Sequence, residues 1–241
     1  MIEWFGLSDP GLERENNEDG FLGDPDRALF VVADGMGGHR GGEVASAMLI
    51  ETLAALPPPG DRPWATLRAG VLAANEAILA RAAAPGLRGM GATCTALHLG
   101  PELATLVQVG DSRAYFLSHD LLSGGPYLEL LTRDQTVYRM LVDLGHAEPD
   151  EDEERHSPLL QAVGRRGLRP QPYVIERARA PAWLLCSDGL SGVVPAAELE
   201  AWIRRDDLSL EEICRELVGR ANELGGPDNI TVLLVRDATQ R

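Results

Sequence analysis

Residues 29–35 read Leu-Phe-Val-Val-Ala-Asp-Gly, so that five apolar residues lead directly into Asp34 and Gly35. An apolar run of this length that ends at a turn predicts a buried β-strand, and the Asp-Gly pair predicts a tight turn directly after it. Three more aspartates border apolar runs in a similar way: Asp111, Asp188 and Asp228. The sequence therefore predicts a framework of buried strands with four carboxylates at strand ends.

The same reading along the chain predicts an α+β fold. Short apolar runs between turn residues predict eight strands, at residues 29–33, 93–99, 103–109, 114–117, 128–131, 173–178, 183–186 and 230–235. Helix-forming stretches fall at residues 43–56, 63–84, 135–144, 195–204 and 209–224. Several strands are joined by only two to four residues, which permits hairpins and so mainly antiparallel sheets. Because the helices come in groups, we expect them to pack on these sheets in one domain, residues 1–241.

A single Asp-Gly pair indicates a turn more often than a functional site. Four strand-end carboxylates together change this interpretation, because the chain has no lysine to neutralise them and like charges that converge repel one another. Divalent cations supply the missing positive charge, and oxygen ligands without His or Cys clusters favour Mg²⁺, Mn²⁺ or Ca²⁺. Glycines follow the aspartate in the stretch Asp34-Gly35-Met36-Gly37-Gly38, so its backbone carbonyls are also accessible as ligands. The five histidines show no metal-binding spacing and are interpreted as surface or core residues.

A polar segment near the N-terminus adds a cation to this pattern. It contains Arg14, Glu18 and Asp19, and its simplest interpretation is a polar loop. Alternatively, Arg14 supplies a planar fork for phosphate oxygens, while Glu18 and Asp19 join the carboxylates. Carboxylate-held metals with one arginine are typical of phosphate-ester hydrolysis, and the residues alone leave the substrate open.

The charge balance excludes several function classes. The chain of 241 residues has 22 Lys and Arg against 37 Asp and Glu, a net charge of 22 − 37 = −15, which argues against a binder of nucleic acid or anionic membranes. All 22 basic residues are arginine. Walker-type nucleotide binding, protein kinases, Schiff-base enzymes and haloacid-dehalogenase-type phosphatases need a lysine and are excluded.

The remaining features indicate a cytoplasmic protein. Cys94, Cys186 and Cys214 are far apart and odd in number, so we expect buried thiols in a reducing compartment. The first residues show neither the basic nor the apolar part of a signal peptide, and no run approaches the roughly 20 apolar residues of a membrane span. The acidic run at residues 150–154 is expected to be a solvated loop.

Nine ordered motifs spread over the chain make it resemble the metal-dependent Ser/Thr protein phosphatases of the PPM (type 2C) family, in the compact bacterial form. They are Arg14-x-x-Asn17-Glu18-Asp19, Val32-Ala33-Asp34-Gly35-Met36-Gly37-Gly38-His39, Gly41-Gly42-Glu43, Met90-Gly91-Ala92-Thr93, Gly110-Asp111-Ser112-Arg113, Leu131-Thr132-Arg133-Asp134, Leu160-Gln161-Ala162-Val163-Gly164, Cys186-Ser187-Asp188-Gly189 and Gly226-Pro227-Asp228-Asn229.

The resemblance implies an αββα sandwich, two mainly antiparallel sheets flanked by helix pairs, with two Mg²⁺ or Mn²⁺ ions in a cleft at one end. It implies that Asp34 bridges the two ions and that the Gly35 carbonyl binds the first. Asp188 and Asp228 would hold the second ion, and Asp111 with Asp188 matches the site of a weaker third metal in bacterial members. The residues implied to support these ligands, the acidic ones through metal-bound water, are Glu18, Asp19 and Asn229.

The resemblance also implies a mechanism, in which a hydroxide that bridges the metals attacks phosphorus in line while Arg14 clamps the phosphate. Animal members carry a histidine directly after the Asp-Gly pair, whereas this chain has Met36, which leaves His39 or a metal-bound water as the proton donor. Gln135-Thr136 replaces the His-Ser of many bacterial members. Residues 137–159 are expected to form a flap beside the cleft, whose acidic run disfavours acidic phosphopeptides.

Three functions follow from this interpretation. The first is a phosphatase of phosphoserine and phosphothreonine in proteins, which reverses a bacterial Ser/Thr kinase and is a monomer. The second is a catalytically silent regulatory or binding protein on the same fold, against which the metal aspartates argue because all of them are present. The third is a phosphatase of a non-protein phosphate ester.

Overall fold

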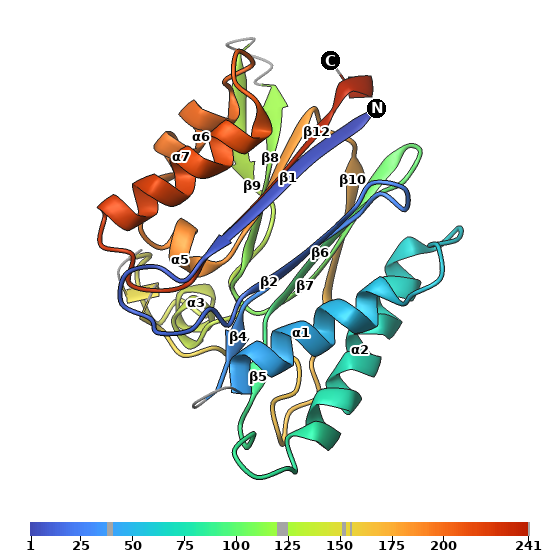
Figure 1. Ribbon diagram of the computed structural model, residues 1–241, viewed down its shortest axis with the longest axis vertical. Helices are drawn as coiled ribbons and strands as arrows, with labels where there is room; N and C mark the ends of the chain where they lie inside the picture. Colours follow the sequence, from blue (N-terminus) through green and yellow to red (C-terminus); the bar gives the residue numbers. More distant parts are fainter. Residues whose placement is uncertain (38–40, 120–124, 151–152, 155, 241) are drawn as a thin grey trace.

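The computed structural model describes residues 1–37, 41–119, 125–150, 153–154 and 156–240 (Figure 1). Two antiparallel five-stranded sheets lie face to face, with strand orders β1-β12-β11-β8-β9 and β10-β7-β6-β3-β2. The strands of the first sheet are β1 (Ile2–Asp9), β12 (Ile230–Asp237), β11 (Ala182–Cys186), β8 (Arg113–His119) and β9 (Pro126–Leu130). Those of the second are β10 (Tyr173–Ala178), β7 (Leu103–Val109), β6 (Cys94–Leu99), β3 (Leu29–Ala33) and β2 (Gly20–Asp24). A two-stranded ribbon pairs β4 (Gly35–Met36) with β5 (Gly91–Ala92).

Helices cover both outer faces of the sandwich, which confirms the αββα architecture (Figure 1). On the second sheet lie α1 (Gly41–Ala54) and α2 (Pro63–Arg81), and on the first lie α6 (Ala196–Ile203) and α7 (Leu210–Glu223). Two shorter helices, α3 (Val137–Asp143) and α5 (Asp188–Ser191), stand at one end of the sandwich (Figure 1). The last described residues form a 3₁₀ turn, Ala238–Gln240.

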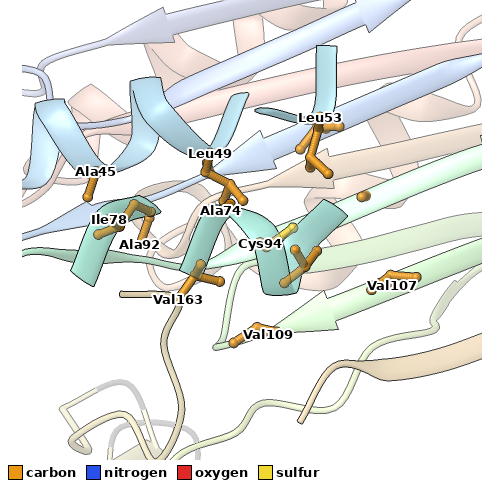
Figure 2. Close-up of a cluster of buried hydrophobic side chains, with 14 of the residues drawn as sticks. Ala45, Leu49, Leu53, Ala74, Ile78, Ala92, Cys94, Val107, Val109 and Val163 are labelled. Atoms are coloured by element: carbon orange, nitrogen blue, oxygen red, sulfur yellow. The ribbon is translucent and has the colours of Figure 1, made fainter. Parts of the chain in front are cut away.

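Apolar side chains fill the three spaces between these four layers. Leu49, Leu53 and Ile78 pack from α1 and α2 onto the second sheet (Figure 2). Between the sheets, the rings of Phe116 and Trp183 lie 5.7 Å apart, and both side chains are fully buried. Each sheet thus buries both faces, which explains why the central strands read as unbroken apolar runs instead of alternating ones.

All eight predicted strands are present, and the sequence analysis missed β1, β2 and the two-residue strands β4 and β5. β1 and β2 are edge strands of their sheets and are only half-buried, so they lack the continuous apolar run of the central strands. Glycines also weaken their signal, yet the packing requires them. A Cβ atom at Gly6 would lie 2.5 Å from the ring of Phe21, and one at Gly23 would lie 2.3 Å from the ring of Trp4. The glycines make room for aromatic rings between the two sheets.

The predicted helices are present, with ends set by local chemistry. Ser209 caps α7 through a capping box with Glu212, as the sequence indicates. The helix expected from residue 135 begins instead at Val137, because the hydroxyl of Thr136 caps it by accepting the backbone N–H of Arg139. Asp188 was expected to follow its strand in a tight turn but is the first residue of α5, where a carboxylate suits the exposed N–H groups.

Two further expectations concern buried side chains. The three cysteines are free and buried, as expected. The interpretation of residues 150–154 as a solvated loop is wrong at Glu154, which is only 7% exposed. Both carboxylate oxygens of Glu154 accept hydrogen bonds from the Arg139 guanidinium, at 2.6 and 2.5 Å, and this pairing allows its burial. Residues 151–152 lie outside the described part. No described helix is long and apolar enough to cross a membrane.

Candidate active site

The strand ends bring the four predicted aspartates to one cleft, with a volume of about 870 Å³. Asp34 follows β3, Asp111 follows β7, Asp188 follows β11 at the start of α5, and Asp228 precedes β12. All four line the cleft, although they come from both sheets and are up to 194 residues apart (228 − 34 = 194). Arg14 lies on its rim.

The carboxylates are close enough to perturb one another. Burial raises the pKa of Asp34 well above its ordinary value, and the negative charges of Asp19 and Asp188 raise it further. Burial and the charge of Asp188 do the same for the pKa of Asp111. Burial and the charge of Asp228 raise the pKa of Asp188. The cleft is thus a region of strongly negative potential that a cation would relieve.

Asp19 has an asymmetric set of partners. Its Oδ2 atom accepts hydrogen bonds from the hydroxyls of Ser187 and Thr231, each at 2.7 Å. Its Oδ1 atom is inaccessible to solvent and has no hydrogen-bond partner among the described residues, and the same holds for Oδ1 of Asp188. Burial raises the pKa of Asp19 to about 7. Two buried carboxylate oxygens without partners are a costly arrangement that a cation or its bound water would satisfy.

Backbone contacts fix the turn that carries Asp34. The hydroxyl of Thr93 accepts the Asp34 N–H at 2.9 Å and lies 2.6 Å from the hydroxyl of Ser112. The next residue, Gly35, is confined between two backbone segments, since a Cβ atom there would lie 2.3 Å from both the Glu18 and Gly42 carbonyl oxygens. Only glycine fits this position, which leaves the backbone of the turn open to the cleft.

The N-terminal segment is held against the last motif of the chain. The side-chain amide of Asn229 accepts the Glu18 N–H at 2.7 Å and donates to the carbonyls of Pro10 and Asn16, both at 2.9 Å. The Nη2 atom of Arg14 lies 2.7 Å from Oδ2 of Asp228 in a solvent-exposed ion pair. Asn229 thus places both Arg14 and Glu18 at the cleft.

Both the sequence and the fold of this chain are similar to those of known proteins. Residues 13–223 match the sequence profile of the family described as protein phosphatase 2C. The chain belongs to the protein phosphatase 2C family. That assignment confirms the resemblance seen in the nine motifs, and the two antiparallel sheets with their helix pairs agree with it.

Several bacterial phosphatases are similar to this 2C-family chain over nearly its whole length. It is 36% identical over 239 residues to the Ser/Thr protein phosphatase PstP of Mycobacterium tuberculosis, which covers 97% of this chain and 45% of PstP. The chain thus spans less than half the length of PstP. It is 35% identical to the Ser/Thr phosphatase Stp of Listeria monocytogenes, over 97% of this chain and 96% of Stp.

Solved structures give the same result. A crystal structure of the M. tuberculosis PstP superimposes with a TM-score of 0.86 at 37% identity and covers 98% of both chains. The catalytic domain of PstP, solved in complex with two manganese ions, gives a TM-score of 0.83 at 38% identity, over 98% of this chain and 97% of that one.

The residues of this 2C-family cleft fit divalent ions of the Mg²⁺ type. Among the described residues, no three His, Cys, Asp or Glu side chains lie together in a way that could hold a metal ion by themselves. The carboxylates instead line an open cleft, which suits an ion that keeps several of its water ligands, as Mg²⁺ does in proteins. The partnerless oxygens of Asp19 and Asp188 supply the acceptors that such waters need.

Some residues of the site received no role in the sequence analysis. The hydroxyls of Ser187 and Thr231 donate to the Asp19 carboxylate. The hydroxyl of Thr93 accepts the backbone N–H of Asp34. Arg165 and Ser157 also line the cleft. Met36 does so too, as its position after Gly35 predicts, while His39 lies outside the described residues.

Proposed function

We propose that this chain is a metal-dependent protein phosphatase that hydrolyses phosphoserine and phosphothreonine. The observation that carries the proposal is the cleft itself, in which four strand-end aspartates and Arg14 meet. The similarity of the whole chain to bacterial Ser/Thr phosphatases supports the same reaction. Asp34 and Asp188 have raised pKa values because burial and the neighbouring carboxylates disfavour their charge, and Arg14 lines the same cleft. This combination suits a site in which cations hold a phosphate ester.

Each site residue receives a role on this proposal. Asp34, the Gly35 carbonyl, Asp188 and Asp228 hold two Mg²⁺ or Mn²⁺ ions, as many as the manganese ions in the PstP structure. Asp111 with Asp188 would hold a weaker third ion. Glu18, Asp19 and Asn229 support these ligands. The ions, when bound, supply Lewis acidity and lower the pKa of water toward neutrality.

The protein's own groups bind and orient the substrate. The Arg14 guanidinium, already beside Asp228, presents planar donors to two phosphate oxygens and holds the ester over the aspartates. Because these aspartates are buried at the cleft, their negative potential acts mainly on groups bound inside it. Met36 has no proton to give, so it cannot protonate the leaving serine or threonine oxygen.

The biological setting belongs to the same proposal. Residues 1–241 form one catalytic domain, in which residues 137–159 act as a flap beside the cleft. The substrates are phosphoproteins, and a cognate bacterial Ser/Thr kinase supplies them in the cytoplasm as part of signal transduction. The enzyme acts as a monomer. The bacterial relatives and the negative net charge, which disfavours nucleic acid and anionic membranes, support this setting.

The test is phosphate release from a phosphothreonine peptide, titrated with Mn²⁺ and with Mg²⁺ and repeated in excess EDTA. We expect release that depends fully on the metal. Turnover that persists in EDTA would contradict the metal assignment. A folded, metal-loaded protein that releases phosphate only from small esters would favour the non-protein substrate, and one with no turnover on either would favour the silent binding protein.

A further inference from the structure

A second groove lies outside the catalytic cleft, between α2 and the segment that leads into β10. Its volume is about 630 Å³. Trp64, Arg68 and Leu72 line it from α2, and Arg169 and Tyr173 line it from the other side. None of its lining residues belongs to the catalytic cleft, so this groove is a separate surface.

The groove is basic within an acidic protein. Its only charged lining residues are Arg68 and Arg169, both exposed, and the structure shows no ion pair for either among the described residues. Residues 156–175 contain three arginines and no Asp or Glu, although the chain carries 37 acidic residues. Two unpaired guanidinium groups without a carboxylate between them form a site for negatively charged groups.

The rest of the groove is apolar and aromatic. Tyr173 is 54% exposed, and Trp64 and Leu72 are partly exposed beside it. Tryptophan, tyrosine and arginine are the residues that contribute most to protein–protein binding energy. The combination therefore fits a peptide with both carboxylates and a large apolar side chain, whereas the net charge of −15 disfavours nucleic acid.

The far wall of the groove is fixed in place. The N–H of Gln171 donates to Oε1 of Gln161 at 2.7 Å, and Pro170 is buried beside it. Tyr173 pairs with Gln108 at the start of β10. A preformed wall reduces the entropy that a docking peptide loses, and thus favours binding.

One segment connects the groove to the catalytic cleft. Arg165 lines the cleft and Arg169 lines the groove. Because Arg169 is four positions after Arg165, their Cα atoms lie at most about 14 Å apart. A substrate chain whose phosphoresidue occupies the cleft thus needs only a few further residues to reach the groove.

We propose that this groove docks an acidic segment of the phosphoprotein substrate, with carboxylates on Arg68 and Arg169 and an apolar side chain against Trp64, Leu72 and Tyr173. That the docked chain is the substrate rests on the proposed phosphatase function. The segment lies a few residues along the substrate chain from the phosphoresidue, because a short stretch of extended chain is enough to span up to about 14 Å. Acidic residues next to the phosphoresidue face the acidic flap instead, so only distant ones promote turnover.

The test compares two phosphothreonine peptides that share a core and differ in a tail that begins six residues from the phosphoresidue. One tail is Glu-Glu-Leu-Phe-Glu, and the other replaces its glutamates by glutamine. For the wild-type protein we expect at least a tenfold higher kcat/KM with the acidic tail, through KM. The R68E/R169E variant loses this advantage and keeps its kcat/KM on the neutral peptide. R81E/R88E makes the same charge change at exposed positions outside the groove and serves as the matched control.

Fluorescence anisotropy of the labelled acidic tail without phosphothreonine separates docking from catalysis. We expect the wild type and R81E/R88E to bind it and R68E/R169E to bind at least tenfold more weakly, whether or not the protein is active. An equal loss in both variants, or no binding to the wild type, would overturn the proposal. So would self-association of the wild-type chain that R68E/R169E abolishes, which would assign the groove to a second copy.

Discussion

Replacing Asp19 by asparagine removes a charge that the metal-free fold holds at a cost. Oδ2 of Asp19 accepts two hydroxyl hydrogen bonds, from Ser187 and Thr231, and an asparagine oxygen preserves both. Oδ1 is buried without a partner, so the amide nitrogen that takes its place breaks no hydrogen bond among the described residues. We therefore expect Asp19→Asn to stabilise the metal-free protein while it impairs metal binding.

The pKa of Asp19 sets the size of this effect. Burial raises that pKa from 3.8 to about 7, so the folded state binds the proton more tightly than the unfolded state does. The charge therefore costs stability, and the cost grows as pH rises from about 4 to about 7 and is constant above that. Linkage gives a cost of about 2 kcal/mol at pH 5.5 and at most about 4 kcal/mol at pH 8, all of which asparagine avoids.

The assay is urea unfolding in EDTA at pH 5.5 and at pH 8, with Asp61→Asn, on the exposed loop before α2, as the control. The free energy of unfolding of Asp19→Asn should exceed that of the wild type at both values, and by about 2 kcal/mol more at pH 8 than at pH 5.5. The control should show no such difference between the two pH values.

Addition of Mn²⁺ should narrow the stability difference between the two proteins. Saturation at one hundred times the dissociation constant stabilises a protein by about 2.7 kcal/mol per site, and the variant should gain less because it offers the ions less negative charge. A variant that is no more stable than the wild type in EDTA, or whose advantage is the same at both pH values, would refute the reasoning from the buried charge.

Three other predictions test single positions. Asp34→Asn or Asp228→Asn should lower metal-dependent phosphate release at least about a hundredfold without a change in circular dichroism, and an unchanged rate would exclude that residue as a ligand. Ser209→Ala should lower Tm by about 2–4 °C, because it removes about 1 kcal/mol of helix capping, and should leave activity unchanged. Gly164→Ala should cost at least about 2 kcal/mol in urea unfolding, because φ is +86° there and the new Cβ atom would lie 2.1 Å from Cγ2 of Ile78; a midpoint equal to wild type contradicts this.

The fold was largely predictable because burial on both faces marks the central strands. The run at residues 29–33 became β3, and that at residues 230–235 became most of β12. The edge strands β1 and β2 carry no such mark, whereas the edge strands β9 and β10 were predicted from short apolar runs. In β1 every residue but the exposed Glu3 is half-buried, and in β2 two of the five residues are glycines, one of which, Gly23, accommodates the ring of Trp4. Such glycines are explained only by contacts between the sheets, which local sequence does not record.

The site was predictable where its chemistry lies in the chain's own motifs. Carboxylates at strand ends are visible in the sequence, and so is the arginine beside them. The hydroxyls that orient the carboxylates were not predicted, because Ser187 and Thr231 meet Asp19 from positions more than 160 residues away (187 − 19 = 168). Glu154 was mistaken for a solvated residue for the same reason, since its partner Arg139 lies on a different element.

The supporting hydroxyls and the buried carboxylates with raised pKa values act together at this site. Thr93, Ser187 and Thr231 each lie next to or within a buried strand, so the sheets fix the positions of Asp34 and Asp19 before any ion arrives. Preorganisation of this kind concentrates negative charge that the metal-free fold would be more stable without. The gain in unfolding free energy of Asp19→Asn in EDTA therefore measures the cost of holding this acidic side chain in place without ions, and binding of the ions offsets that cost.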